Sequence, residues 1–213
     1  SGALGLAVGG ALGEMNEKQQ HMLKLAQQNS LRLGKLINDL LDIEKLAVNK
    51  MQFKFRLWPL AELLRQSIEL NQPVALQRQV TLELQSPEQA DLWVEVDEVR
   101  VQQVMANLLA NAIRYSAVGA VVRVTMELSA KTVRVSVIDQ GPGVSDSFEP
   151  RLFEKFSQAD SSDRRQVAGT GLGLAICKEL IKAMRGDIGY QRSTEGGACF
   201  YFTLPLATEL SLE

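Results

Sequence analysis

The stretch VAGTGLGLAIC, residues 167–177, places three glycines at alternate positions directly before an amphipathic segment. Glycine removes side chains that would block a ligand from the backbone, and the N–H groups at a helix N-terminus bind anions. The pattern therefore predicts a phosphate-binding loop. It lacks the Gly-Lys-Ser/Thr ending of a Walker A loop, and it follows a polar loop and not a strand, which argues against a dinucleotide-binding fingerprint.

A polar segment, residues 157–168, precedes these glycines and carries Arg164 and Arg165. Because such a polar segment is unsuited to burial in a protein core, we predict a mobile lid whose arginines contact phosphates. A flexible surface loop is the alternative.

The stretch VIDQGPGV, residues 137–144, is an apolar strand that ends in Asp139 and continues with Gly141 and Gly143. A carboxylate at a strand end accepts N–H donors, such as the exocyclic amine of a base, and the glycines let a ligand approach the backbone closely. The stretch predicts a base-binding corner, with a plain turn as the alternative.

The stretch ANLLANAIRYS, residues 106–116, places Asn107 and Asn111 on one face of a helix, because residues four apart are neighbours there. Two neutral amides can coordinate a hard cation and hydrogen-bond phosphates without repelling them. Arg114 and Tyr115 lie one turn further on, where a cation could reach a phosphate. A solvated amphipathic helix is the alternative.

In order and spacing, these motifs resemble the ATP-binding domain of bacterial sensor histidine kinases, within the gyrase and histidine-kinase ATPase superfamily. ANLLANAIRYS is similar to the N box, DQGPG to the first glycine box, LFEKF to the F box and GTGLGL to the second glycine box. The resemblance covers roughly residues 55–206. It implies an α+β chain: a partial helical hairpin over residues 1–50, then a two-layer α/β sandwich with a mixed sheet, the Bergerat ATP-binding fold, over residues 51–213.

The resemblance also implies a role for each matching position, with ATP and Mg²⁺ as ligands. Asp139 would hold the adenine amine, Asn111 would ligate Mg²⁺, and Asn107 would lie near the transferred phosphate. Phe153 and Phe156 would anchor the lid. The other residues implied around the nucleotide are Arg114, Tyr115, Gly141, Gly143, Lys155, Phe156, Gly169, Thr170, Gly171, Leu172, Gly173 and Leu174.

Residues 1–50 resemble the second half of the family's dimerisation and phosphotransfer hairpin. A seam of residues spaced alternately four and three apart is typical of a coiled coil and needs a partner helix. We therefore expect a homodimer through residues 1–50, with residues 1–12 ending a preceding helix and Gly13 in the turn. The seam consists of Met22, Ala26, Asn29, Leu33, Leu36, Leu40, Ile43 and Ala47.

The family's acceptor motif, roughly His-Glu-x-x-Thr/Asn-Pro, does not occur in this sequence, whose single histidine is His21. We interpret His21 as a surface residue and expect the acceptor to lie upstream of Ser1. The chain would then bind ATP without phosphorylating itself. It would transfer the γ-phosphoryl group to a histidine on a companion segment, for onward transfer to the aspartate of a response-regulator receiver domain.

Composition narrows the other function classes. The formal net charge of −2 gives no basic field for nucleic acid, and no apolar run approaches a membrane span. We expect a cytoplasmic chain without membrane contact of its own, compatible with a parent protein anchored in the bacterial inner membrane. Cys177 and Cys199 lack metal-binding spacing and suit a reducing compartment. A nucleotide-responsive regulatory module without kinase activity remains the alternative, whereas a gyrase-like hydrolase would need a carboxylate base where Asn107 stands.

The coarse pattern of elements follows from periodicity. A long helix is predicted to end near Lys50, and Pro59 to open the next helix in its first turn. The other predicted elements are strands at 51–58, 80–85 and 92–97, a helix at 97–116, a hairpin of 121–129 with 131–141, a helix at 172–184 and two final strands around a Gly-Gly turn.

Overall fold

A computed structural model of the chain describes Gly9, Gly13 and residues 15–85, 92–158, 170–194 and 196–207. The chain divides into two compact units, residues 1–50 and residues 51–213, and each is considered by itself. Apart from Gly9, residues 1–12, in which the end of a preceding helix is predicted, lie outside the described residues. No helix in the described ranges is long and apolar enough to cross a membrane.

The first unit contains one long helix, α2 (Glu17–Ala47). Asn16 begins it with a capping box, because its side chain accepts the Gln19 N–H while the Gln19 side chain accepts the Asn16 N–H. Ile43 is buried, but other members of the predicted seam are exposed: Met22 by 71% and Leu33 by 58%. The presence of α2 confirms the predicted long helix, and most of its large apolar side chains are exposed to solvent.

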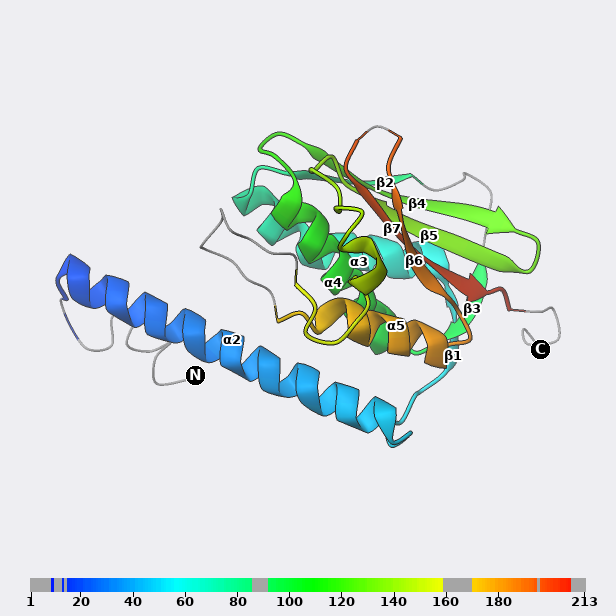
Figure 1. Cartoon of the computed structure of the whole chain (residues 1–213), viewed down its shortest axis with the longest axis horizontal. Coiled ribbons are helices and arrows are strands. Elements are labelled where there is room, and N and C mark those ends of the chain that lie inside the picture. Colours follow the sequence, from blue (N-terminus) through cyan, green and yellow to red (C-terminus); the bar gives the residue numbers. More distant parts are fainter. Residues whose placement is uncertain are drawn as a thin grey trace. The chain divides into compact units, whose positions relative to one another are not determined.

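The second unit is a two-layer α/β sandwich (Figure 1). Its main sheet has the order β2-β4-β5-β7-β6, in which β2 is parallel to β4 and the other pairs are antiparallel. The mixed sheet confirms the predicted fold class. Its strands are β2 (Thr81–Gln85), β4 (Val121–Ser129), β5 (Thr132–Ile138), β6 (Ile188–Arg192) and β7 (Ala198–Pro205).

Three helices cover one face of this sheet (Figure 1): α3 (Leu60–Gln77), α4 (Glu98–Tyr115) and α5 (Gly173–Ala183). The covered face is apolar because alternate residues along each strand point toward the helices, as Val133, Val135 and Val137 do on β5. A short 3₁₀ turn, η1 (Glu149–Arg151), follows β5. The segment after β5 packs on the C-terminal end of α4, and the N-terminus of α5 lies against Asn107 of the same helix.

Helix α4 forms where the sequence predicts it. The Asp97 side chain caps it by accepting the Arg100 N–H at 3.3 Å. Its apolar face is fully buried, and this burial fixes which side of the helix remains available to a ligand. The buried face consists of Val101, Val104, Met105, Leu108, Leu109, Ala112 and Ile113.

The strand predicted at residues 51–58 is wrong in extent. The strand that forms, β1 (Arg56–Pro59), pairs with β3 (Trp93–Val96) in a separate two-stranded sheet. The residues before Arg56 do not form a strand, and the rings of Phe53 and Phe55 stack there with centroids 5.6 Å apart. An alternating pattern alone does not supply a partner strand. Pro59 precedes α3, which begins at Leu60, and so does not lie in the first turn.

Candidate functional site

Asp139 forms the centre of the site, immediately after β5. Its side chain is 3% exposed. Its Oδ1 accepts two backbone N–H groups, from Gly141 at 2.8 Å and from Ala198 on β7 at 3.0 Å. The Asp139 N–H donates to the Ala198 carbonyl at 2.9 Å. The backbone N–H and the carboxylate of Asp139 together thus extend the β5–β7 ladder by one residue pair. Among the described residues both bonds to the carboxylate go to Oδ1, and Oδ2 remains available to a ligand.

Burial raises the pKa of the Asp139 carboxyl above the ordinary value of an aspartate, because desolvation disfavours the charged form. The N–H groups of Ala198 and Gly141 oppose this shift, since they stabilise the carboxylate, but desolvation is the larger effect. No ion pair within the described ranges includes Asp139. A neutral donor that brings a further N–H to this carboxylate would therefore be favoured.

Three glycines give this corner its shape. A Cβ on Gly141 would lie 2.6 Å from the Tyr115 carbonyl oxygen, so the backbone after Asp139 packs directly on the end of α4. Gly143 has a φ of +72°. A Cβ on Gly197, in the turn between β6 and β7, would lie 2.1 Å from the Asp139 carbonyl oxygen. The corner therefore tolerates no side chain at Gly141 or Gly197 without a backbone shift.

The polar side of α4 that carries Asn107 and Asn111 borders the start of α5. Asn107, Asn111 and Arg114 are half-buried and recur at helical spacing on the side of α4 that the core does not cover. A Cβ on Gly173 would lie 3.3 Å from Asn107 Oδ1. The structure thus brings the N-terminus of α5 against Asn107, although the two residues are far apart in sequence.

The second glycine segment also packs on residues that follow η1. A Cβ on Gly171, whose φ is +71°, would lie 2.8 Å from the Phe156 carbonyl carbon. Phe156 itself has a φ of +60° and a side chain that is 63% exposed. The Thr170 Oγ1 accepts the Leu172 N–H at 3.2 Å just before α5 begins. These contacts shape a backbone turn at the N-terminus of α5.

The remaining predicted residues differ in their exposure to solvent. Leu172 is fully buried, so that only its backbone could meet a ligand. Lys155 and Tyr115 are exposed, and Leu174 is half-buried. Three predicted phosphate contacts lie outside the described residues: Gly169, Arg164 and Arg165.

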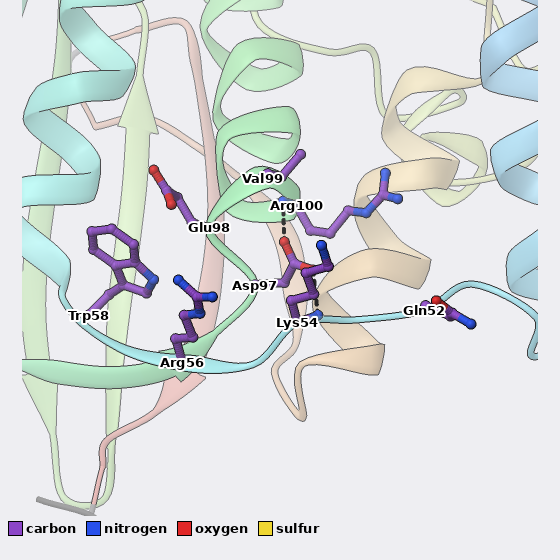
Figure 2. A pocket seen from close by; sticks show the side chains of 8 residues that line it. All are labelled: Gln52, Lys54, Arg56, Trp58, Asp97, Glu98, Val99 and Arg100. Carbon is purple, nitrogen blue, oxygen red and sulfur yellow. Dashed lines mark hydrogen bonds between the residues drawn. The ribbon is translucent and has the colours of Figure 1, made fainter.

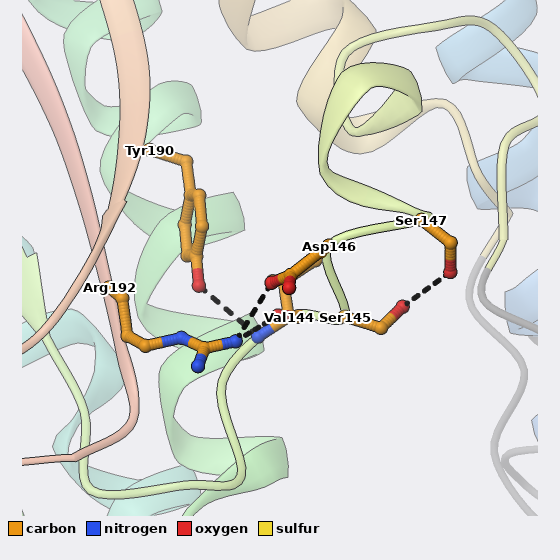
Figure 3. A network of polar contacts seen from close by, with 6 residues as sticks. All are labelled: Val144, Ser145, Asp146, Ser147, Tyr190 and Arg192. Carbon is orange, nitrogen blue, oxygen red and sulfur yellow. Dashed lines mark hydrogen bonds and ion pairs between the residues drawn. The ribbon is translucent and has the colours of Figure 1, made fainter.

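Two residues at this corner were missed by sequence reasoning. Gly197 was expected only to form a turn, and nothing in a Gly-Gly pair indicates a contact with Asp139. Tyr190 on β6 reaches the segment after Gly143, where its hydroxyl accepts the Val144 N–H at 3.2 Å (Figure 3). An isolated tyrosine in a strand gives no signal of this kind.

A separate hollow of about 370 Å³ lies at the opposite end of α4, beside its first turn (Figure 2). Lys54, Trp58 and Arg100 are among its lining residues, and the Lys54 N–H donates to Asp97 Oδ2 at 2.8 Å. None of the predicted nucleotide residues lines it. We therefore assign the candidate site to the Asp139 corner and the start of α5, on the strength of their chemistry.

Sequence comparison places the chain among ATPases. The profile of the family described as "Histidine kinase-, DNA gyrase B-, and HSP90-like ATPase" matches residues 96–208. The chain is 32% identical over 200 residues to the circadian input-output histidine kinase CikA of Synechococcus elongatus, covering 93% of the chain and 26% of CikA. It is 32% identical over 198 residues to the sensory/regulatory protein RpfC of Xanthomonas campestris pv. campestris, covering 91% of the chain and 27% of RpfC. The chain thus spans about a quarter of the length of these relatives.

Solved structures agree with this placement. Full-length ShkA in complex with AMPPNP matches with a TM-score of 0.79 at 30% identity, covering 96% of this chain and 42% of ShkA. A nucleotide-free catalytic domain of the histidine kinase ThkA matches with a TM-score of 0.61 at 28% identity, covering 71% of this chain and 95% of that domain. The family predicted from the motifs is confirmed.

Proposed function

The chain belongs to the family of histidine kinase-, DNA gyrase B- and HSP90-like ATPases, and from this premise we propose that it is the ATP-binding catalytic region of a two-component sensor histidine kinase. Residues 51–213 form the catalytic domain, and residues 1–50 form part of a dimerisation and phosphotransfer hairpin. The protein acts in the cytoplasm. The observation that carries the proposal is the buried Asp139 carboxylate with one oxygen held by the backbone.

Asp139 recognises the adenine. Because Oδ1 already accepts two N–H groups, the carboxylate cannot rotate freely, and Oδ2 accepts the exocyclic amine of the base. Gly141 and Gly143 leave room for the base against the backbone. This arrangement favours adenine over guanine, because guanine presents a carbonyl acceptor where adenine presents the amine.

The phosphates bind at the start of α5. The helix N-terminus and the glycine backbone from Gly169 to Gly173 supply N–H donors, with Thr170 beside them. Asn107 lies against Gly173 and orients the transferred phosphate. Arg114 and Lys155 provide the positive charge, while Tyr115 and Phe156 border the nucleotide.

Asn111 is the proposed ligand for Mg²⁺. The described residues contain no group of three or more His, Cys, Asp or Glu side chains that could hold a metal ion by themselves. In nucleotide sites Mg²⁺ takes few protein ligands and is held mainly by phosphates and water. When bound, Mg²⁺ would offset the charge that develops on the γ-phosphoryl group.

The phosphoryl acceptor is a histidine on a companion segment, followed by a response-regulator aspartate. His21 is exposed on α2, and we propose that it is not the acceptor. Asn107 stands where a hydrolase of the gyrase type would need a carboxylate base, and an amide cannot activate water. Transfer to another protein group is therefore favoured over hydrolysis.

Residues 1–50 mediate homodimerisation. The large apolar side chains along α2 that lie open to solvent support this part of the proposal, because an amphipathic helix is stabilised when its apolar face is covered. The exposed set includes Met22, Leu25, Leu31, Leu33, Ile37, Leu40 and Leu41.

Calorimetric titration with a non-hydrolysable ATP analogue, with and without Mg²⁺, tests the nucleotide site. We expect Mg²⁺-dependent binding that Asp139→Asn abolishes, because the amide can present a donor to the adenine amine. Asp187→Asn is the matched control, since Asp187 is exposed directly before β6 and makes none of the contacts of the corner. A folded chain that binds no analogue would refute the proposal.

A second assay separates a kinase from a regulatory module. The chain is incubated with γ-labelled ATP and a supplied hairpin helix that carries an acceptor histidine. Acid-labile label on that helix is the expected result. Binding of ATP without any transfer would favour the alternative, a nucleotide-responsive module without kinase activity.

A further inference from the structure

We propose that Tyr190 is a positioning residue of the nucleotide site, which fixes the first glycine segment through its phenolic oxygen. This inference rests on the proposed function, because it assigns a role at the same adenine corner. Tyr190 lies on β6 and acts on the site through the backbone of Val144.

The contact is specific in geometry. The Tyr190 Oη accepts the Val144 N–H at 3.2 Å, and a Cβ on Gly143 would lie 3.7 Å from the same oxygen. The ring is held from the other side by Phe200, its cross-strand partner on β7, with ring centroids 5.3 Å apart. The hydroxyl is therefore presented to the glycine segment by a rigid strand pair.

Arg192 strengthens the same link two residues further along β6. Its Nη2 donates to the Val144 carbonyl at 3.3 Å and to Asp146 Oδ1 at 3.1 Å (Figure 3). Both backbone polar groups of Val144 are thus bonded to β6. The Arg192–Asp146 pair is largely exposed, so we assign it a smaller share of the positioning than the Tyr190 hydroxyl.

The two attachments lie on either side of Gly143. Asp139 holds the Gly141 N–H on one side, and Tyr190 holds the Val144 N–H on the other. Gly143 has a φ of +72°, and glycine has the widest backbone freedom of all residues, so hydrogen bonds to Gly141 and Val144 restrict the conformation of the segment between them. Without the hydroxyl, this segment would have to be ordered when the nucleotide binds, and affinity would fall.

The test compares Tyr190→Phe with Tyr201→Phe in the full chain. Tyr201 pairs with Gly189 on the neighbouring strand and stacks on Arg134, so the control removes a tyrosine hydroxyl close by without touching Val144. We expect Tyr190→Phe to weaken binding of the non-hydrolysable ATP analogue with Mg²⁺ by about 3-fold, in line with one lost hydrogen bond. Tyr201→Phe should leave the affinity unchanged.

Amide hydrogen exchange tests the contact itself, whereas the affinity for the ATP analogue tests whether this contact positions the nucleotide site. In the unmutated chain, the Val144 amide should be protected, and Tyr190→Phe should accelerate its exchange while the Gly141 amide keeps its protection. Arg192→Gln, an exposed substitution, should give a smaller change in the same direction.

The outcomes distinguish this inference from the proposed function. An unmutated chain that binds no analogue would overturn both. Normal binding that Tyr190→Phe leaves unchanged would overturn the inference alone, as would a Val144 amide that exchanges rapidly in the unmutated chain. The last result holds even if Tyr190→Phe fails to fold.

Discussion

The corner around Asp139 and the helix α2 differ in how many of their polar and apolar groups find contacts within the chain. At the corner, the buried carboxylate accepts two backbone N–H groups, and Gly141 and Gly197 pack on backbone atoms at distances that no side chain would allow. Along α2, large apolar side chains such as Met22 and Leu33 remain exposed. The contacts of the corner lie within residues 115–198, whereas the described part of α2 leaves large apolar side chains exposed.

This difference teaches which properties the chain can carry by itself. In the proposed function, nucleotide binding uses groups of the second unit, and association uses the exposed apolar face of α2. Substitutions in the two regions should therefore change different measurements, and the two sets of properties should separate by experiment.

The largest effect is expected from Gly197→Ala. A Cβ there would lie 2.1 Å from the Asp139 carbonyl oxygen, and the φ of +88° is unfavourable for alanine. We expect a loss of about 2–4 kcal/mol in the free energy of unfolding, together with loss of binding of the ATP analogue. Urea unfolding and calorimetry measure the two effects.

Gly196→Ala is the matched control for this substitution. Gly196 has a φ of +84°, but its Cβ would meet no described atom within 4 Å. It should therefore show only the backbone cost of about 1–2 kcal/mol and retain nucleotide binding. Equal effects of the two substitutions would contradict the contact between Gly197 and Asp139.

The second prediction concerns α2. The double substitution Leu33→Lys and Leu40→Lys places charges on the predicted seam, and we expect the dimer dissociation constant to rise at least about tenfold, since a buried unpaired charge is unfavourable. Analytical ultracentrifugation measures association, and calorimetry should give unchanged nucleotide affinity. Gln28→Lys, at another exposed position, is the control. An unmutated chain that stays monomeric at every concentration would contradict the proposal that α2 mediates dimerisation.

The third prediction uses the raised pKa of Asp139. In the proposed site the ionised carboxylate binds the adenine amine. Affinity should therefore fall by up to about tenfold per pH unit once the pH drops below this pKa, which is reached earlier than for an ordinary aspartate. Folding responds with the opposite sign. The folded state binds the proton more tightly than the unfolded state, so the contribution of Asp139 to stability rises as the pH falls through the interval between the two pKa values.

Calorimetry and urea unfolding at a series of pH values separate these two trends. Asp139→Asn should remove the trend in stability, because the amide does not titrate. The trend in affinity is measured on the unmutated chain, since this variant is expected not to bind the analogue. An affinity that stays constant while the unmutated chain is taken to pH values at which Asp139 is protonated would argue against an ionised carboxylate as the adenine acceptor.

Much of the fold could be predicted because its signals are local. Helix α4 has a strong apolar period with Asp97 at its cap, and the β4–β5 hairpin turns at Ala130, as expected. The position of Asp139 at a strand end followed from the apolar run before it. The extent of β1 could not be predicted, because its partner β3 follows in the chain only after α3 and β2.

The missed parts of the site share a physical cause. Gly197 and Tyr190 act through atoms of residues far away in sequence, so their types show only a turn and a strand. Leu172 illustrates the reverse, since its motif predicts a ligand contact while its side chain is buried. A motif marks the backbone that approaches a ligand, and the surrounding packing decides which side chains do.

The smallest effect is expected from Asn16→Ala, which removes the capping box of α2. The side chain of Asn16 accepts the Gln19 N–H at 2.9 Å, and its loss should lower helix stability by about 1 kcal/mol. Asn16→Asp retains an oxygen acceptor and serves as control. Circular dichroism should show earlier melting of helix for Asn16→Ala only, while the affinity for the ATP analogue stays the same, because the contacts of the adenine corner all lie within residues 115–198. A parallel loss of affinity would mean that the end of α2 and the nucleotide site are energetically coupled, and the separation of the two regions would then fail.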